Sequence, residues 1–118
     1  MSADIINQWL RAAQVRSPVD GYPLAPRRLT CADGFHMSVQ ASRGHYCSPR
    51  GNDGPWQKVE IGFPSDRVEE FMPYIDGDEN TDPLQAVYGY VPVEIVDAVI
   101  AAHGGLDGEC LAKIGGAA

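Results

Sequence analysis

Two stretches of the chain alternate apolar and polar residues, and this period of two constrains the fold more than any other feature. In a strand, successive side chains point to opposite faces of the sheet, so each stretch predicts a strand with one buried face. The apolar positions are Phe35, Met37, Val39 and Ala41 in the first stretch and Val59, Ile61 and Phe63 in the second. The turn signal Asp33-Gly34 precedes the first stretch and predicts a hairpin with residues 28–32.

Three helices and a fourth strand are predicted around these strands. Residues 3–15 repeat apolar side chains at three- and four-residue spacing, which is typical of an amphipathic helix. Capping signals predict a short helix over residues 65–72 and a last helix that begins at Pro92. Residues 86–91 have the β-branched and aromatic content of a strand. This order predicts an α+β domain: a small, mostly antiparallel sheet of about four strands with N-terminal, middle and C-terminal helices packed on it.

Proline and glycine divide the chain into three predicted parts. Residues 1–28 hold the first helix and a proline-rich connector, residues 29–105 form the α+β core domain, and residues 106–118 are a flexible tail rich in glycine and alanine. A chain of 118 residues, of which 44% are apolar, can bury a core. The connector also leaves room for a homodimer that exchanges the N-terminal helix.

The N-terminus and the cysteines indicate the cellular compartment in which the protein is expected. The first residues, Met-Ser-Ala-Asp, lack the basic stretch and apolar run of an export signal, and no apolar run approaches the roughly 20 residues of a membrane span. We therefore expect a cytoplasmic protein without a membrane partner. The three cysteines, Cys31, Cys47 and Cys110, form an odd set that favours free thiols.

Charge is divided unevenly along the chain. Residues 1–58 carry a net charge of +3 and residues 59–118 one of −10, within a total of −7. Ten carboxylates lie between residues 60 and 97, where Arg67 is the one basic residue. Such a band attracts cationic surfaces, including the basic grooves in which other proteins hold nucleic acid, although ordinary solubility also explains acidic bands. The overall charge disfavours direct binding of nucleic acid by the chain itself.

The long loop over residues 42–56 supports a second interpretation. It is rich in glycine and proline, and it carries arginine and aromatic side chains that suit a phosphate and a base. The candidate ligand-binding residues are Arg43, Tyr46, Arg50 and Trp56. Ion pairs between these arginines and the surplus carboxylates are the plainer explanation.

Three further chemistries are weaker matches to the sequence. His45 and Cys47, with Cys31 or His36, contain zinc-ligand types but lack a Cys-x-x-Cys knuckle, and as a thiol and its base they lack a third orienting residue. Residues 76–82 place oxygen ligands at alternate positions but lack the glycine and the closing glutamate of a calcium loop. We therefore assign no catalytic residue, no metal and no cofactor, and we expect a protein that is not an enzyme.

Several segments resemble a family of small phage and prophage proteins. They are residues 29–42, residues 45–50 (His-Tyr-Cys-Ser-Pro-Arg), residues 59–65, residues 87–96 (Val-Tyr-Gly-Tyr-Val-Pro-Val-Glu-Ile-Val) and the ending His-Gly-Gly at 103–105. The resemblance brings no known active site with it. It implies a setting, since small, acidic, cytoplasmic phage proteins are often inhibitors of host defence, and anti-CRISPR proteins are the best populated class.

These observations together predict a phage-encoded inhibitor of a bacterial defence system, similar to anti-CRISPR proteins. It would bind a basic, nucleic-acid-binding surface of the defence protein through the acidic band, by nucleic-acid mimicry or steric block. The expected partner-binding residues are Glu69, Glu70, Asp76, Asp78, Glu79 and Asp82. The alternative is a protein that sequesters a nucleotide immune signal through the loop residues named above.

Overall fold

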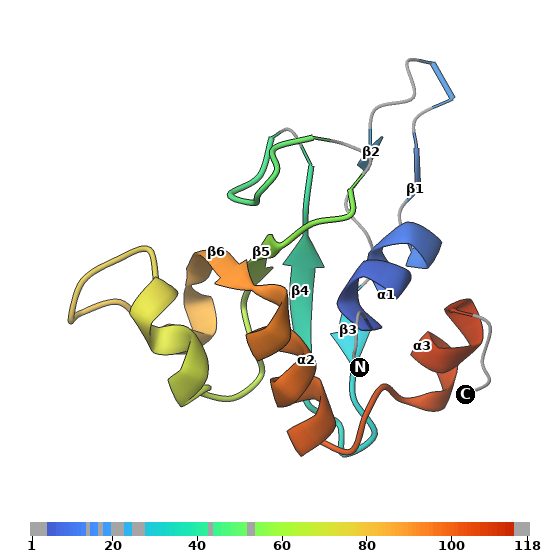
Figure 1. Ribbon diagram of the computed structural model, residues 1–118. Helices are drawn as coiled ribbons and strands as arrows, with labels where there is room; N and C mark the ends of the chain where they lie inside the picture. Colours follow the sequence, from blue (N-terminus) through green and yellow to red (C-terminus); the bar gives the residue numbers. More distant parts are fainter. Residues whose placement is uncertain are drawn as a thin grey trace.

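The computed structural model describes residues 5–13, 15–16, 18–19, 23–24, 28–42, 44–51 and 54–114. This part of the chain has the predicted α+β fold, with a four-stranded antiparallel sheet in the order β3-β4-β5-β6 (Figure 1). Helices α1 and α2 cross in front of the sheet, and α3 lies beside α1 (Figure 1). None of the described helices has the length and apolar character needed to cross a bilayer.

The alternating stretches form the central strands of the sheet, as predicted, except at Phe63. This residue follows the end of its strand with a φ of 51°, and it is 45% exposed instead of buried. The strands are β3 (Leu29–Thr30), β4 (His36–Gln40), β5 (Lys58–Gly62) and β6 (Val87–Pro92). Val39 pairs with Ile61 and Val59 pairs with Val91, and all four side chains are fully buried. Two further short strands, β1 (Val15–Arg16) and β2 (Pro23–Leu24), pair as a separate antiparallel ribbon within the proline-rich connector.

The N-terminal helix is part of the core. Helix α1 (Ile5–Ala13) buries Ile6, Trp9 and Leu10 completely, and it packs on α2 (Val93–Ala102) and α3 (Gly108–Lys113). The backbone N–H of Ile6 donates to the Asp97 carboxylate of α2 at 3.0 Å. Residues 5–13 and the predicted core domain therefore share one hydrophobic core.

The middle helix differs from the prediction of a helix over residues 65–72. It is a 3₁₀ helix, η1 (Glu69–Tyr74), and Pro73 lies inside it. Proline cannot donate the i−4 bond of an α-helix, whereas the tighter turn is held by Phe71 N–H to Val68 O and Ile75 N–H to Met72 O. A second 3₁₀ turn, η2 (Pro83–Gln85), precedes β6.

The structure has a helix and buried side chains over residues 106–114, where the sequence analysis expected a flexible tail. Leu106 pairs with Cys31 beside β3, and Cys110 of α3 is buried. Asp107 caps α3, since its carboxylate accepts from the Cys110 N–H at 2.8 Å. The sequence analysis did not consider Asp107 as a helix cap, because the segment is rich in glycine and alanine. The last predicted tail residues, 115–118, lie outside the described part of the chain.

A histidine–aspartate contact joins the end of α2 to the turn of the first hairpin. His103 Nδ1 lies 2.7 Å from Asp33 Oδ2, and its ring stacks on Phe35 with the centroids 4.3 Å apart. The carboxylate of Asp33 also accepts from the Phe35 N–H at 3.0 Å. The backbone bond and then the histidine lower the pKa of Asp33 below its ordinary value.

This contact predicts a loss of stability in acid. A carboxylate whose folded pKa is depressed stabilises the fold above its unfolded pKa, and the contribution disappears as pH falls through the folded pKa. We expect the free energy of unfolding to decrease below about pH 4, and Asp33→Asn to remove part of that decrease. Urea unfolding at a series of acidic pH values measures it. Asp66→Asn is the control, because exposed Asp66 has no hydrogen-bond partner among the described residues; equal slopes in both variants would contradict the prediction.

Candidate functional site

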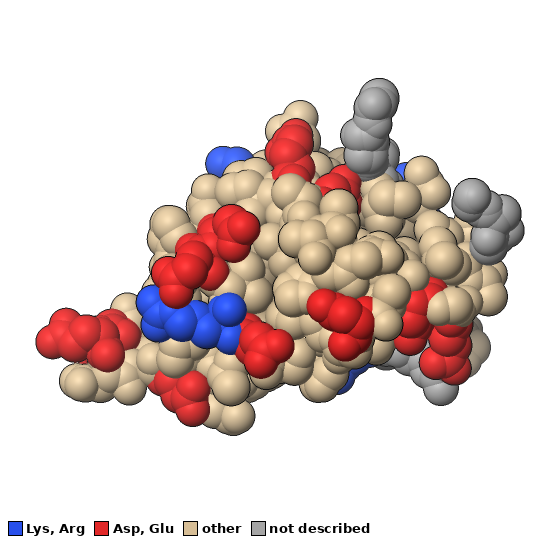
Figure 2. Space-filling view, turned by 90° about the horizontal axis from the view of Figure 1, so that it is seen from below, with Lys and Arg blue, Asp and Glu red and all other residues tan. Residues whose placement is uncertain are grey.

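The most acidic described surface is a lobe formed by η1 and the loop that follows it. We define the acidic lobe as residues 66–82, which carry seven carboxylates against the single Arg67. All seven acidic residues are exposed: Asp66, Glu69, Glu70, Asp76, Asp78, Glu79 and Asp82. The lobe thus contains all six predicted partner-binding residues. Figure 2 shows that acidic groups extend inward from its protruding tip as separate clusters, with a basic group among them.

Two of these carboxylates build the loop. Asp78 Oδ1 accepts from the Asn80 N–H at 2.9 Å, and the Asp78 N–H donates to Thr81 Oγ1 at 2.9 Å. Asp82 caps η2 by accepting from the Leu84 N–H at 2.9 Å. The alternation that resembled a calcium loop is therefore explained by turn geometry. Among the described residues, no group of three or more His, Cys, Asp or Glu side chains is placed to hold a metal ion.

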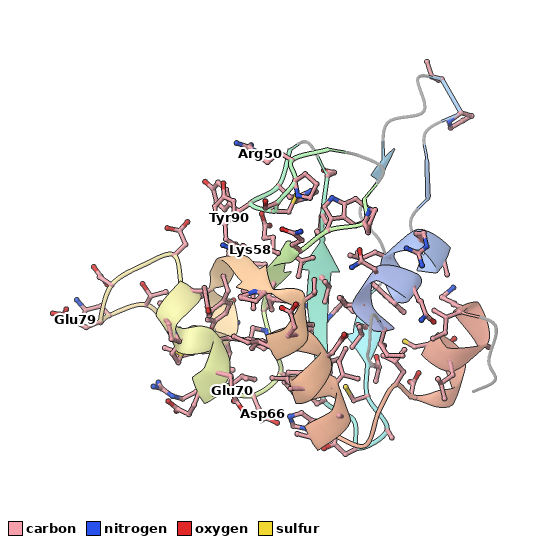
Figure 3. The ribbon with its side chains drawn as sticks, in the orientation of Figure 1. Arg50, Lys58, Asp66, Glu70, Glu79 and Tyr90 are labelled. Atoms are coloured by element: carbon pink, nitrogen blue, oxygen red, sulfur yellow. The ribbon has the colours of Figure 1, made fainter. Side chains whose placement is uncertain are left out.

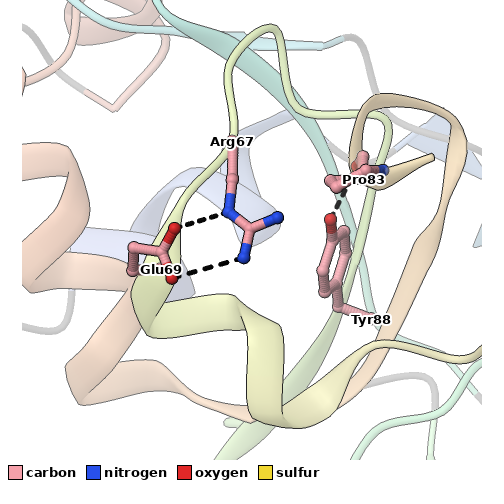
Figure 4. Close-up of polar contacts among 4 residues, drawn as sticks. All are labelled: Arg67, Glu69, Pro83 and Tyr88. Carbon is pink, nitrogen blue, oxygen red and sulfur yellow. Dashed lines mark hydrogen bonds and ion pairs between the residues drawn. The ribbon is translucent and has the colours of Figure 1, made fainter. Parts of the chain in front are cut away.

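A third carboxylate is paired with the arginine of the lobe. Arg67 Nε lies 2.5 Å from Glu69 Oε2, and Nη2 lies 3.5 Å from Oε1 (Figure 4). The hydrogen bond between Arg67 and Glu69 lowers the pKa of Glu69 and raises the pKa of Arg67. The negative field of the lobe therefore comes mainly from the other carboxylates. Three of them are labelled in Figure 3, with Glu79 on the protruding loop and Asp66 and Glu70 along the lower edge.

The base of the lobe is fixed to the sheet. Phe71 is fully buried, and its ring lies 5.9 Å from that of Tyr88 on β6. Tyr88 donates its hydroxyl to the Pro83 carbonyl at 2.6 Å (Figure 4), and its backbone pairs with Ile75. The Asp76 N–H donates to the Val87 carbonyl at 2.8 Å. The carboxylates are thus presented on an ordered protrusion rather than on a free loop.

A small cleft lined by tyrosines borders the acidic lobe. Its volume is about 280 Å³, and it is lined by Tyr46, Tyr74, Ile75, Asp76, Gly89 and Tyr90. We call it the tyrosine cleft. Tyr46 and Tyr90 are 45% and 41% exposed, and their ring centroids lie 5.9 Å apart at an angle of 32°. Asp76 belongs to both surfaces, so the cleft and the acidic lobe are continuous.

An irregular strand pairing places the two tyrosines together. Between the pairs Val59–Val91 and Ile61–Tyr88, the single residue of β5 opposes two residues of β6, Gly89 and Tyr90, which is a β-bulge. Tyr90 has a φ of 57°, in the left-handed region that few tyrosines occupy. Its N–H donates to the Tyr46 carbonyl at 3.0 Å.

Close backbone packing sustains this arrangement. A Cβ at Gly89 would lie 3.1 Å from the Cβ of Tyr46, so glycine lets the two segments approach. The Tyr46 N–H donates to Glu60 Oε1 at 3.0 Å. The sequence analysis singled out Tyr46, but nothing in the sequence indicated the bulge that brings Tyr90 beside it.

The three described members of the predicted loop ligand set, Tyr46, Arg50 and Trp56, have different surroundings. Trp56 is 2% exposed, and its indole N–H donates to the Gly51 carbonyl at 3.1 Å within the loop. Tyr46 lines the tyrosine cleft, whereas Arg50 is exposed on the loop above it (Figure 3). Arg43 lies outside the described residues.

His45 and Cys47 of the loop each contact Ser42. His45 Nδ1 lies 2.6 Å from Ser42 Oγ, and Cys47 Sγ donates to the Ser42 carbonyl at 3.1 Å. Burial raises the pKa of Cys47, and burial together with Asp33 raises the pKa of Cys31 to about 11. Raised thiol pKa values oppose the thiolate that nucleophilic or zinc chemistry requires.

The described surface thus offers two adjoining features for recognition, an ordered acidic lobe and an aromatic cleft at its root. Exposed carboxylates suit cationic groups, and exposed tyrosines are common anchors in protein interfaces. Comparison with protein-family models, with curated proteins and with solved structures finds no match to this chain.

Proposed function

We propose that this protein acts by binding rather than by catalysis, and that its acidic lobe docks on a basic, nucleic-acid-binding surface of a bacterial defence protein. It would be a phage-encoded inhibitor similar to anti-CRISPR proteins, at work in the host cytoplasm. One observation carries the proposal: seven exposed carboxylates stand on an ordered protrusion whose single arginine is already paired with Glu69.

Physical properties of the lobe favour such docking. Its net charge of −6 attracts a basic surface over roughly the 10 Å of a Debye length in ordinary salt, which raises the association rate. The hydrogen bonds of Asp78 and Asp82 order the loop before binding, so little conformational entropy is lost on docking. The carboxylates form separate clusters (Figure 2), which suits contacts with individual basic side chains and steric block of a groove.

A plaque assay tests the proposal. The chain is expressed in bacterial strains that each carry one defence system directed against the same phage. We expect plaque formation to recover by orders of magnitude in the strain whose defence protein is bound, and to stay unchanged in a matched strain without that system. If no strain responds, the inhibitor proposal is wrong for the systems assayed.

A further inference from the structure

We propose that the tyrosine cleft receives the guanidinium group of an arginine side chain from the partner. This inference rests on the proposed function, because a basic nucleic-acid groove is where arginine side chains are concentrated. This arginine would anchor the docking of the acidic lobe.

The shape and lining of the cleft suit one planar cation. Its volume of about 280 Å³ lies below the usual range of roughly 300–1,000 Å³ for small-molecule pockets, and it suits a single side chain. The rings of Tyr46 and Tyr90 are inclined by 32° with their centroids 5.9 Å apart. Aromatic faces attract guanidinium both electrostatically and by stacking, and tyrosine is enriched at the centres of protein interfaces.

The charge of the lining selects a cation over an anion. Asp76 is the one charged residue among the six described residues that line the cleft, and it is exposed. A guanidinium that stacks on a tyrosine ring in the cleft can form a charge-assisted hydrogen bond with this carboxylate. A phosphate in the same place would face it and be repelled. Lys58 and Arg50 are exposed, and neither lines the cleft.

The backbone holds the cleft ready for its occupant. Tyr90 keeps a φ of 57° because the bulge and its hydrogen bond to the Tyr46 carbonyl fix the segment. Bulges of this kind redirect a side chain, and exposed non-glycine residues in the left-handed region are frequent at binding sites. The result is that two large rings face solvent beside the acidic lobe instead of joining the core.

An NMR titration with short peptides tests the inference without the partner. The probes are the tripeptide acetyl-Gly-Arg-Gly-amide and its citrulline counterpart, which has the same shape but no charge. We expect the arginine peptide to shift the ring signals of Tyr46, Tyr74 and Tyr90 with millimolar affinity, and the citrulline peptide to do so far less. Tyr90→Leu should lower the affinity for the arginine peptide by about threefold to fivefold. Tyr90→Phe requires the same left-handed backbone and keeps an aromatic ring, so it should retain binding. Asp76→Asn should also lower the affinity for the arginine peptide.

Each other outcome overturns the inference. Equal shifts with both peptides would mean that the cleft binds by apolar contact and not by charge. The same rings shifted by AMP but not by the arginine peptide would assign the cleft to a nucleobase, and no shift with any probe would leave it without the proposed occupant. Because the titration uses the purified chain alone, its failure leaves the plaque assay of the acidic lobe to stand or fall by itself.

Discussion

Reversal of three lobe carboxylates, Asp66→Lys, Glu70→Lys and Glu79→Lys together, is expected to reduce partner binding by at least about 100-fold and to abolish plaque recovery. All three residues are exposed, and none of their side chains has a hydrogen-bond partner among the described residues. Substitutions at exposed positions of this kind change the free energy of unfolding by roughly 0.5 kcal/mol or less. The loss of binding would therefore come from the changed charge and not from unfolding. Plaque counts in the responding strain, and calorimetry with the purified defence protein of that strain, measure the loss of binding.

The choice of these residues follows from the hydrogen bonds of the lobe. Asp78, Asp82 and Glu69 are also acidic, but the first two order the loop and the third is paired with Arg67. Their substitution would mix loss of charge with loss of structure. The three free carboxylates therefore give the cleanest measure of the electrostatic contribution.

Two controls separate the field of the lobe from general charge effects. The neutral set Asp66→Asn, Glu70→Gln and Glu79→Gln should weaken binding less than the reversal set, and it should reduce the salt dependence of the affinity. Glu94→Lys makes a single reversal at an exposed position of α2 and should have little effect on binding. If the reversal set inhibits defence as well as the wild-type chain, the acidic lobe is not the docking surface.

The parts of the fold that were predictable are those with a local period. Alternation placed Met37, Val39, Val59 and Ile61 on one buried face, and three- and four-residue spacing placed Ile6, Trp9 and Leu10 on another. The 3₁₀ character of η1 was missed because the hydrogen bonds around Pro73 decide it. Helix α3 was missed because its composition resembles that of a frayed end.

In the candidate site, too, the features set by local sequence were predictable and those set by contacts between distant segments were not. Each lobe carboxylate was visible in the sequence, and charged side chains are seldom buried without a partner. The tyrosine cleft depends on a bulge in the pairing of β5 with β6, which no period reveals. Trp56 of the loop ligand set lies in the core, and its aromatic ring suited the core as well as a ligand.

A buried asparagine provides the second large expected effect. Asn7 of α1 is 2% exposed, and its amide binds the backbone of Trp56 twice: Oδ1 accepts from the Trp56 N–H, and Nδ2 donates to the Trp56 carbonyl, both at 2.8 Å. Its place on the helix face beside Ile6 and Trp9 gave no hint of this role. The amide replaces a strand partner for the segment that leads into β5, and so it joins the first helix to the sheet.

Asn7→Ala is expected to lower the free energy of unfolding by about 3 kcal/mol, because a buried donor and a buried acceptor of Trp56 would both lose their partner at roughly 1–3 kcal/mol each. In a domain of this size the loss corresponds to a decrease in melting temperature of about 10 °C. Gln8→Ala, at the neighbouring exposed position of α1, is the matched control and should change stability little.

Asn7→Asp should destabilise the protein nearly as much as Asn7→Ala, since a carboxylate can accept from the Trp56 N–H but repels the Trp56 carbonyl. Thermal and urea unfolding measure these changes. If alanine costs less than about 1 kcal/mol, the double hydrogen bond does not hold α1 to the sheet.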